Sequence, residues 1–464
     1  MDHQHGLVTG FAIDKGVDLW FNVNGEPGSS KANTDRTDRT DSKANTDRTD
    51  RTDSETNTDR TDRTDVKANT NSSNDTNKWS LGHVHLESRT FEGAVDFEID
   101  APSQVKERHW GDYARGAKYA LRKRFELHKG IEGVIQGSLP VGGLSSSAAV
   151  LIAYVMAFAK ANDITLQPFE VVKIASEAER EYIGLNNGLL DQACIALSKR
   201  NQLLFLDCDS NEYRLIPFGG VKANTDFTDN TDVKSNTNST NNTNGLGPAE
   251  NADSTERLQA NTDGTDKTDS DLPFEIGIFF SGLTRSLVNS DYNLRVYECK
   301  TAAWNMLAYT DQPLKTFDKT FLRDIPKATF DKTRIAMPAR FARRAEHFYS
   351  EYRRVRQGVT AWETGNMKLF GKLSFDSCES SIHNYECGSP ELIAIYEIMR
   401  SLPGVYGGRF SGAGFKGACI ALVDPAYKEE IQKVLTEKYL EQFPEYEKTF
   451  QVFWVKPDDG ARFV

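Results

Sequence analysis

A glycine- and serine-rich stretch, residues 137–149 (GSLPVGGLSSSAA), constrains the fold of this chain more than any other feature. A short strand-like run precedes it at 131–135. Residues 150–160 behind it are apolar on almost every side, which predicts a buried helix. The adjacent Gly142 and Gly143 allow backbone conformations closed to other residues and a close approach to a ligand. The pattern is therefore strand, glycine turn, serine cluster and helix.

This pattern predicts a phosphate-binding site. Serines at the start of a helix can satisfy its free N–H groups, and a helix N-terminus attracts phosphate through its unpaired amides and positive dipole end. A tight turn before a capped helix is the alternative, but two glycines before three serines at a buried helix form a rarer pattern than a glycine pair alone. The stretch lacks the Gly-Lys-Ser/Thr ending of a Walker loop, which excludes the NTPases built on that loop.

Residues 139–148 (LPVGGLSSSA) resemble the nucleotide loop of the GHMP kinases, and within that family the sugar-1-kinases, closest to the galacturonokinases. The resemblance extends from Asp2 to about Pro425, apart from two insertions. It implies a two-domain α/β (α+β) fold with the active site between the domains. The implied reaction transfers the γ-phosphoryl group of ATP, with Mg²⁺, to the anomeric oxygen of D-galacturonic acid. The implied ATP-binding residues in this stretch are Gly142, Gly143, Leu144, Ser145, Ser146, Ser147 and Ala148.

Glu179 lies on a helix predicted to begin at Pro168 and to run to about Tyr182. It follows Val172 by seven residues, so it projects from the apolar stripe of that helix. A carboxylate on an inward face is costly unless it is paired or bound to a cation. A salt bridge and a metal ligand therefore both remain open. The resemblance favours the metal, because Glu179 matches the metal-binding glutamate of the family; Ser147, or failing that Ser146, would be the hydroxyl ligand of Mg²⁺.

Asp191 follows a glycine turn in residues 187–192 (NGLLDQ). An aspartate there is either the N-cap of a helix over 192–198 or a group directed at a ligand. The context resembles the Gly-x-x-Asp-Gln of galactokinases. That resemblance implies that Asp191 is the general base for the anomeric hydroxyl, an effect of roughly 10²–10⁴ in rate. Gly188 in the same turn is expected to contact the substrate.

The chain starts MDHQHG and enters an apolar run at 7–13 without a preceding strand. In similar sugar kinases an earlier strand carries an Arg-x-Asn-x-x-Gly-Glu-His-like motif that ends in Asp followed by Tyr or His, which Asp2 and His3 match. The Arg and the Glu-His pair have no counterpart here, so either the start was assigned too late or part of the site has been lost. Asp2 is accordingly either a ligand of sugar hydroxyls or a mobile residue beside a terminus.

Three further residues have two interpretations each. Trp110, at the start of a helix predicted over 110–128, either stacks on adenine or packs against the core. Tyr292 (NSDYNLR) resembles the sugar-contacting tyrosine of galactokinases, but a surface position at a helix start is also open. Lys416 lies in RFSGAGFKGACI, which resembles the third GHMP motif. Galactokinases usually have Gly there and galacturonokinases a base, so Lys416 either pairs with the substrate carboxylate or is an exposed loop lysine.

Two low-complexity segments interrupt the globular parts. A twelve-residue unit (KANTDRTDRTDS) begins at Lys31 and repeats through 31–78, and a related segment occupies 221–272. Segments with so few apolar residues cannot offset their ordering entropy, which predicts disordered surface insertions, the second between paired strands. The predicted domains are an N-terminal ATP-binding domain, 1–220, and a C-terminal domain, 273–464.

Periodicity and helix-start signals predict the remaining elements. The charged run at 343–347, in a long helix from residue 339, predicts a solvated face. Residues 319–338 are expected to form little structure. The other expected elements are a hairpin over 84–99, strands over 203–207 and 274–280, and helices over 361–378 and 390–401.

Net charge and the distribution of cysteines limit which partners and which compartment can be expected. The two insertions contribute −1 and −6 to the net charge of −11, and the chain has no basic stripe, so a nucleic-acid partner is not expected. Six scattered cysteines predict reduced core thiols in a cytoplasmic protein. A signal peptide and a membrane-spanning run are both missing, so the expected partners are ATP and a small sugar or sugar acid. Two alternatives stay open: a galactokinase or other anomeric sugar kinase, and an inactive relative that binds sugar and ATP as a sensor.

Overall fold

The computed structural model describes most of the chain outside the two low-complexity segments. Almost all of both predicted insertions lies outside the described residues, as do Gly142, Gly143 and Lys416. The side chain of Tyr292 is not described either, although its backbone begins a helix. The described residues are 1–25, 79–102, 106–140, 144–185, 187–220, 272–283, 292–412, 414–415 and 417–464.

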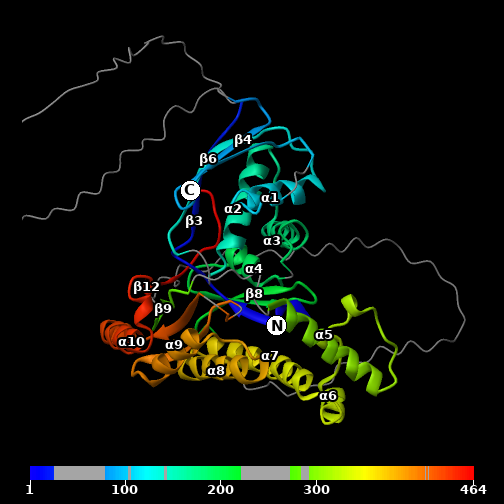
Figure 1. The fold of residues 1–464 in the computed structure, drawn as a ribbon, viewed down its shortest axis with the longest axis vertical. Helices are drawn as coiled ribbons and strands as arrows, with labels where there is room; N and C mark the ends of the chain where they lie inside the picture. The colour runs from blue at the N-terminus through cyan, green and yellow to red at the C-terminus, as the bar shows by residue number, and fades with distance from the viewer. Residues whose placement is uncertain are drawn as a thin grey trace, which may run out of the picture.

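A four-stranded sheet forms the upper part of the molecule, with strand order β3-β6-β4-β5 (Figure 1). The predicted hairpin over 84–99 is confirmed, because β4 and β5 pair antiparallel, and β4 also pairs parallel with β6. Side chains alternate across the sheet, so that Val84 and Leu86 are buried while His83 and His85 lie on the opposite face. The strands are β3 (Val17–Val23), β4 (His83–Ser88), β5 (Ala94–Glu98) and β6 (Ile131–Gly137).

Helices cover the buried face of this sheet (Figure 1). The helix predicted over 150–160 is confirmed and begins at Ser146; it is apolar all round because it lies between the sheet and three other helices. The helix predicted over 110–128 is shorter, because the amides of Arg124 and Phe125 both bond to Leu121 O and the chain turns there. The elements are α1 (Asp112–Arg122), α2 (Ser146–Ala161), α3 (Pro168–Glu177), a π-helical turn η2 (Ala178–Ile183) and α4 (Leu190–Leu197).

The other described strands form three further sheets, β1-β7-β8, β10-β11-β9-β12 and β13-β2. The prediction that the second insertion joins paired strands is wrong: β8 pairs with β7, whereas β9 lies between β11 and β12 in another sheet. Strands β2 and β13 pair, so the last strand of the chain returns to its first residues. The bounds are β1 (Leu7–Gly10), β2 (Ala12–Ile13), β7 (Gln202–Asp207), β8 (Tyr213–Pro217), β9 (Glu275–Phe280), β10 (Val405–Phe410), β11 (Ala418–Val423), β12 (Gln451–Val455) and β13 (Pro457–Asp458).

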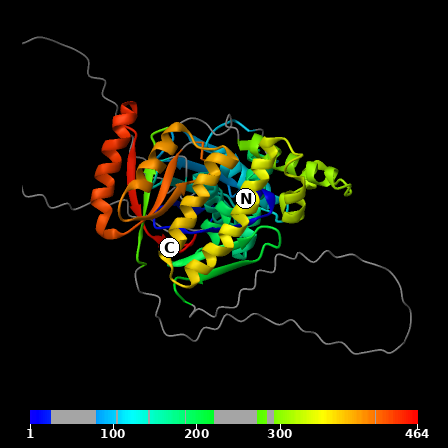
Figure 2. The same cartoon turned by 90° about the horizontal axis from the view of Figure 1, so that it is seen from below.

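The lower part is mainly helical, and α7 and α8 lie side by side across it (Figure 2). The helix predicted from 361 starts only at Met367, because α7 continues to Glu363 and Gly365, at φ 70°, separates the two. The Asn366 side chain then caps α8 by accepting from Leu369 N at 3.1 Å. The helices are α5 (Tyr292–Tyr309), α6 (Lys327–Thr333), α7 (Ala339–Glu363), α8 (Met367–Ser380), α9 (Pro390–Ser401) and α10 (Lys428–Gln442), with short turns η1 (Asp2–Gln4), η4 (Phe317–Lys319), η5 (Leu322–Asp324), η6 (Ser381–Tyr385), η7 (Pro425–Tyr427) and η8 (Pro444–Tyr446).

The charged run of α7 is not a solvated face, so that prediction is wrong. Arg344 is fully buried, and its guanidinium donates to Glu298 Oε2 and to Glu386 Oε2, both at 2.7 Å. It also donates to the backbone oxygen of Asn384 at 2.6 Å. Arg344 is buried because its acidic partners come from α5 and from Glu386, the residue after η6, which a local charge pattern does not reveal.

Replacing Arg344 with alanine is expected to lower the free energy of unfolding by about 3 kcal/mol, because it leaves Glu298 as a buried carboxylate short of a partner. The neighbouring Arg343 is a matched control, since its side chain is 42% exposed and its pairing with Glu386 is worth under about 1 kcal/mol. Urea denaturation measures both. Equal effects of the two substitutions would contradict the buried network.

All six cysteines are described and free, and five of them are buried, which confirms the prediction of unpaired core thiols. Among the described helices, none combines the length and the apolar character needed to cross a bilayer. The division into domains at 220 and 273 stays a prediction.

Candidate active site

The site begins at the first turn of α2. Ser145 precedes this helix at φ 55° and ψ 31°, a left-handed conformation that is uncommon for a residue other than glycine. Its side chain does not cap the helix, contrary to the role expected for the serines, and instead forms a hydrogen bond with Asp191. The first amides of α2 have no acceptor within the helix, so they are available to an anion.

Ser147 and Glu179 meet beside this turn. The Ser147 hydroxyl donates to Glu179 Oε1 at 2.9 Å, and the Gln192 side-chain amide donates to Glu179 Oε2 at 2.5 Å. Glu179 lies in the π-helical turn η2 and is 1% exposed, which confirms that it faces inward. Turns of this kind occur often at functional sites. Among the described residues its hydrogen-bond partners are the neutral side chains of Ser147, Gln192 and Asn187, so the structure there does not support the salt-bridge interpretation.

Burial raises the pKa of Glu179 above its ordinary value. The nearby charge of Asp2 acts in the same direction, whereas hydrogen bonds from Ser147, Asn187 and Gln192 oppose the shift. A buried carboxylate held by neutral donors keeps a strong affinity for a cation. The hydroxyl and carboxylate oxygens brought together here are the hard donors that Mg²⁺ prefers.

Asp191 is the second residue of α4, so it is not the N-cap, a position that Leu189 holds. Burial raises the pKa of Asp191 to about 7, and the charges of Asp2 and Glu179 act in the same direction; the hydrogen bond from Ser145 opposes them. A carboxylate with a pKa near neutrality can both accept and release a proton at physiological pH.

Asp2 lies against the turn that precedes α4. Its Oδ2 accepts from Leu190 N at 3.3 Å, and a Cβ built on Gly188 would lie 2.1 Å from Asp2 Cγ, so only glycine leaves room for this carboxylate. Burial alone would raise the pKa of Asp2, but its hydrogen bonds with His3 hold it well below the ordinary value. Burial also lowers the pKa of His3 to about 4, so this imidazole stays neutral.

Asp2, Gly188, Asp191 and the three serines line one large cleft of about 3060 Å³, whose other walls come from the upper sheet and from α7 and α8. Glu179, which accepts from Ser147, is not among the residues that line it. Trp110 also lines the cleft, where its indole donates to Glu92 O at 3.3 Å and its ring packs against the core below the sheet. The structure thus supports the packing interpretation of Trp110 and leaves the ring beside the cleft. The same cleft reaches Arg409 and Phe415, which belong to the third glycine-rich motif.

The structure therefore brings together most of the residues singled out from the sequence. Glu179, Asp191 and the serine cluster meet at the start of α2, and Asp2 and Gly188 adjoin them. Sequence reasoning missed four polar neighbours. Gln192 and Asn187 hold Glu179; both stood in the motif around Asp191, which was the available signal. His3 stood beside Asp2 in the motif match at the start of the chain, whereas Tyr385, which approaches it to 3.4 Å, carried no signal because 382 residues separate the two.

Two family models match the chain. The model of the GHMP kinases N terminal domain matches residues 112–199, which contain the serine cluster, Glu179 and Asp191. The model described as GHMP kinases C terminal matches residues 359–441.

Similar proteins are known in sequence and in structure. Galacturonokinase of Arabidopsis thaliana is 36% identical over 383 residues, which cover 78% of each chain. Galactokinase of Clostridium perfringens is 29% identical over 364 residues, covering 78% of this chain and 79% of the relative. The crystal structure of Lactococcus lactis galactokinase complexed with galactose superposes with a TM-score of 0.70 at 20% identity, covering 100% of this chain and 91% of the other, a likeness of fold.

Proposed function

Because this chain belongs to the GHMP kinase family, we propose that it is a sugar kinase that transfers the γ-phosphoryl group of ATP to the anomeric hydroxyl of D-galacturonic acid. One observation carries the proposal. A hydroxyl and a buried carboxylate, Ser147 and Glu179, meet at a helix N-terminus beside Asp191, whose pKa lies near 7. The similarity to a plant galacturonokinase supports galacturonate as the acceptor, and the galactokinases support an anomeric sugar kinase more broadly.

The residues at the start of α2 suit a triphosphate with its magnesium ion. The free amides of the first turn and the helix dipole favour phosphate oxygens. Glu179 and Ser147 would hold Mg²⁺, since their oxygens already lie 2.9 Å apart. When bound, Mg²⁺ neutralises charge that develops on the transferring phosphoryl group.

Asp191 would accept the proton of the anomeric hydroxyl, and Ser145 would orient its carboxylate. Both residues line the cleft, and a hydrogen bond from Ser145 favours the charged form of this carboxylate. The carboxylate of Asp2, held charged by His3 and placed by Gly188, would accept hydrogen bonds from sugar hydroxyls. Phosphoryl transfer depends mainly on positioning and charge neutralisation, so these groups suffice in kind.

A panel of acceptors tests the proposal. Initial rates of ADP formation from MgATP would be measured with galacturonate, galactose, glucuronate and glucose. We expect the highest kcat/KM with galacturonate. A preference for galactose would identify a galactokinase, and MgATP binding without turnover of any sugar would favour an inactive sugar- and ATP-binding protein.

The pH dependence of kcat/KM is expected to follow Asp191. Its pKa of about 7 means that the carboxyl is protonated below pH 7 and cannot accept a proton, so kcat/KM should fall about tenfold per pH unit below that value. A bound metal ion favours the charged carboxylate, so the midpoint of the kcat profile should lie lower than that of kcat/KM. A flat profile between about pH 5.5 and 8 would contradict the role of Asp191.

Lys416, in the third glycine-rich motif, is proposed to recognise the substrate carboxylate through its charge. Lys416→Gly should raise KM for galacturonate and leave KM for galactose nearly unchanged, because only the first sugar carries a carboxylate. Lys428, the next lysine along the chain, is a control, since it is already paired with Glu275 of β9 at 2.8 Å. An unchanged KM and preference in Lys416→Gly would show that this lysine has no part in recognition.

A further inference from the structure

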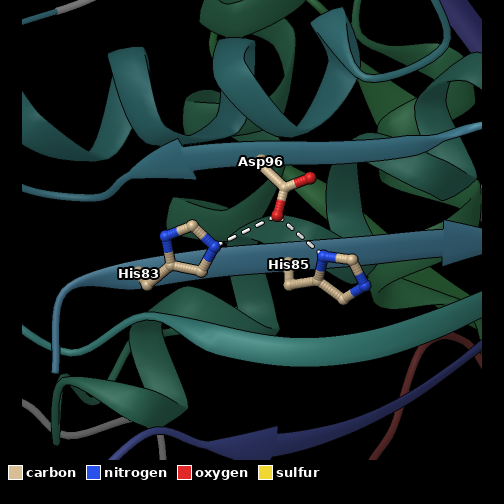
Figure 3. Close-up of side chains that lie close together, drawn as sticks. All are labelled: His83, His85 and Asp96. Atoms are coloured by element: carbon tan, nitrogen blue, oxygen red, sulfur yellow. Dashed lines mark hydrogen bonds and ion pairs between the residues drawn. The ribbon is translucent and has the colours of Figure 1, made fainter. Parts of the chain in front are cut away.

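A second cluster of ligand-type side chains lies away from Asp191, on the face of the upper sheet opposite its helices, where His85 and Glu87 also line the wide cleft. His83 and His85 are alternate residues of β4, so both project from the same side of the strand. Asp96 stands directly opposite His85 in the register of β4 with β5. Figure 3 shows the two imidazole rings on one strand and the carboxylate reaching from the neighbouring strand towards both.

The three ligand atoms already converge. Asp96 Oδ1 lies 3.1 Å from His83 Nε2 and 2.7 Å from His85 Nδ1, and all three atoms lie within 4.8 Å of one another (Figure 3). Around tetrahedral zinc, with bonds of about 2.0–2.1 Å, neighbouring ligand atoms are about 3.3 Å apart. Side-chain rotations that move these three atoms by about an ångström therefore place them at three corners of a tetrahedron.

The outer nitrogen of each ring faces a glutamate. His83 Nδ1 lies 2.9 Å from Glu98 Oε1, and His85 Nε2 lies 3.6 Å from Glu87 Oε1. Metal-binding histidines characteristically donate their second N–H to a carboxylate, which fixes the ring and its tautomer. Both rings thus present one nitrogen to a common point and hold the other against a carboxylate.

The net negative charge of the cluster favours a bound cation. Asp96, Glu98 and Glu87 supply three carboxylates for two imidazoles, so the cluster stays negative even if both rings are protonated. A neutral imidazole has a single N–H, so it cannot donate to carboxylates on both of its nitrogens. A metal ion beside Asp96 would satisfy the inner nitrogens and leave the outer N–H groups to the glutamates.

Trp79 holds both rings in place and leaves the carboxylate open. Its ring stacks on His83 at 4.2 Å and on His85 at 4.9 Å between ring centroids, with interplanar angles of 15° and 20°. The histidine side chains are 14% and 15% exposed, whereas the Asp96 side chain is 47% exposed. An ion can therefore enter from the side of Asp96 and reach two ordered rings.

We propose that His83, His85 and Asp96 form a binding site for a divalent transition-metal ion, Zn²⁺ first among them. A water molecule completes the four-coordinate shell. The ion links the edge strand β5 to β4 and stabilises this hairpin. The site is separate from the Ser147–Glu179 pair and does not depend on the proposed kinase activity.

Titration of the untagged full-length protein with Zn²⁺ alone tests the site. We expect one equivalent to bind in calorimetry and to raise Tm by a few degrees. Co²⁺ should give the intense visible absorption of a four-coordinate ion and quench tryptophan emission, and Trp79→Phe should remove most of that quenching because Trp79 stacks on both ligands.

Variants separate this site from others. His83→Asn with His85→Asn, and independently Asp96→Asn, should abolish the binding, with metal-free Tm and circular dichroism showing that each variant is folded. His128→Asn is a matched control, because His128 is an exposed histidine beside the single carboxylate of Glu126. Glu179→Gln removes the candidate magnesium ligand and should leave Zn²⁺ binding intact. Equal Zn²⁺ binding by the histidine variants and the wild type, or no stoichiometric binding at all, would overturn the proposal.

Discussion

Asp191→Asn is expected to lower kcat/KM for sugar phosphorylation by about 10³–10⁴, at the upper end of what a general base contributes. Asparagine keeps the shape of the side chain and can still bond to Ser145, but it cannot accept a proton. The dissociation constant for MgATP should change by less than about threefold, because the phosphates are assigned to the first turn of α2. Steady-state rates and calorimetry measure the two effects separately.

This substitution should not lower the free energy of unfolding. The pKa of Asp191 is raised on folding. Its contribution to the free energy of unfolding is therefore present at low pH, where the carboxyl is protonated, and is lost as the pH rises through about 7. Asp191→Asn should therefore gain stability relative to the wild type at pH 8 and not at pH 4. Asp163→Asn, at an exposed ion pair with Lys129, is the control and should leave turnover unchanged. Near-normal turnover in Asp191→Asn would remove this residue from the chemistry.

Glu179→Gln is expected to reduce kcat/KM by about 10³, because metal-assisted charge neutralisation is worth several kcal/mol in the transition state. The substitution removes the charge that faces Ser147 and leaves a side chain of equal length. The Mg²⁺ concentration for half-maximal rate should rise at the same time. Partial recovery of the rate at high Mg²⁺ would distinguish a lost ligand from a disturbed fold.

Glu177 provides the matched control two residues away. Its carboxylate pairs with Lys123 at 2.7 Å and with Arg124 at 2.6 Å, two residues that directly follow α1. Glu177→Gln should keep the Mg²⁺ dependence and the rate of the wild type. Equal losses in the two variants would point to helix packing rather than to a metal ligand.

Local patterns in the sequence predicted most of the individual elements. Apolar periodicity located α2 and the inward face that carries Glu179, and the glycine between Glu92 and Ala94 located the hairpin of β4 and β5. These signals depend on neighbours within a few residues, which a single sequence displays directly. The resemblance to the GHMP kinases also predicted the order of the motifs along the chain.

Long-range pairing could not be predicted in the same way. Arg344 was misjudged because Glu298 lies 46 residues away, and β8 and β9 were wrongly paired because sheet partners depend on topology. The Ser145 hydroxyl was expected to cap α2, but the positive φ of this residue turns it towards Asp191. In each case a tertiary contact prevailed over a local preference.

We propose that Asp191 and the start of α2 together direct the transferred phosphate to an anomeric oxygen. Phosphorus NMR of the product formed from MgATP and D-galacturonate tests it most directly. We expect a phosphomonoester signal coupled to the proton on C1, formed by the wild type and absent with Asp191→Asn. A phosphate coupled to any other carbon, or ADP formed without a sugar phosphate, would contradict it.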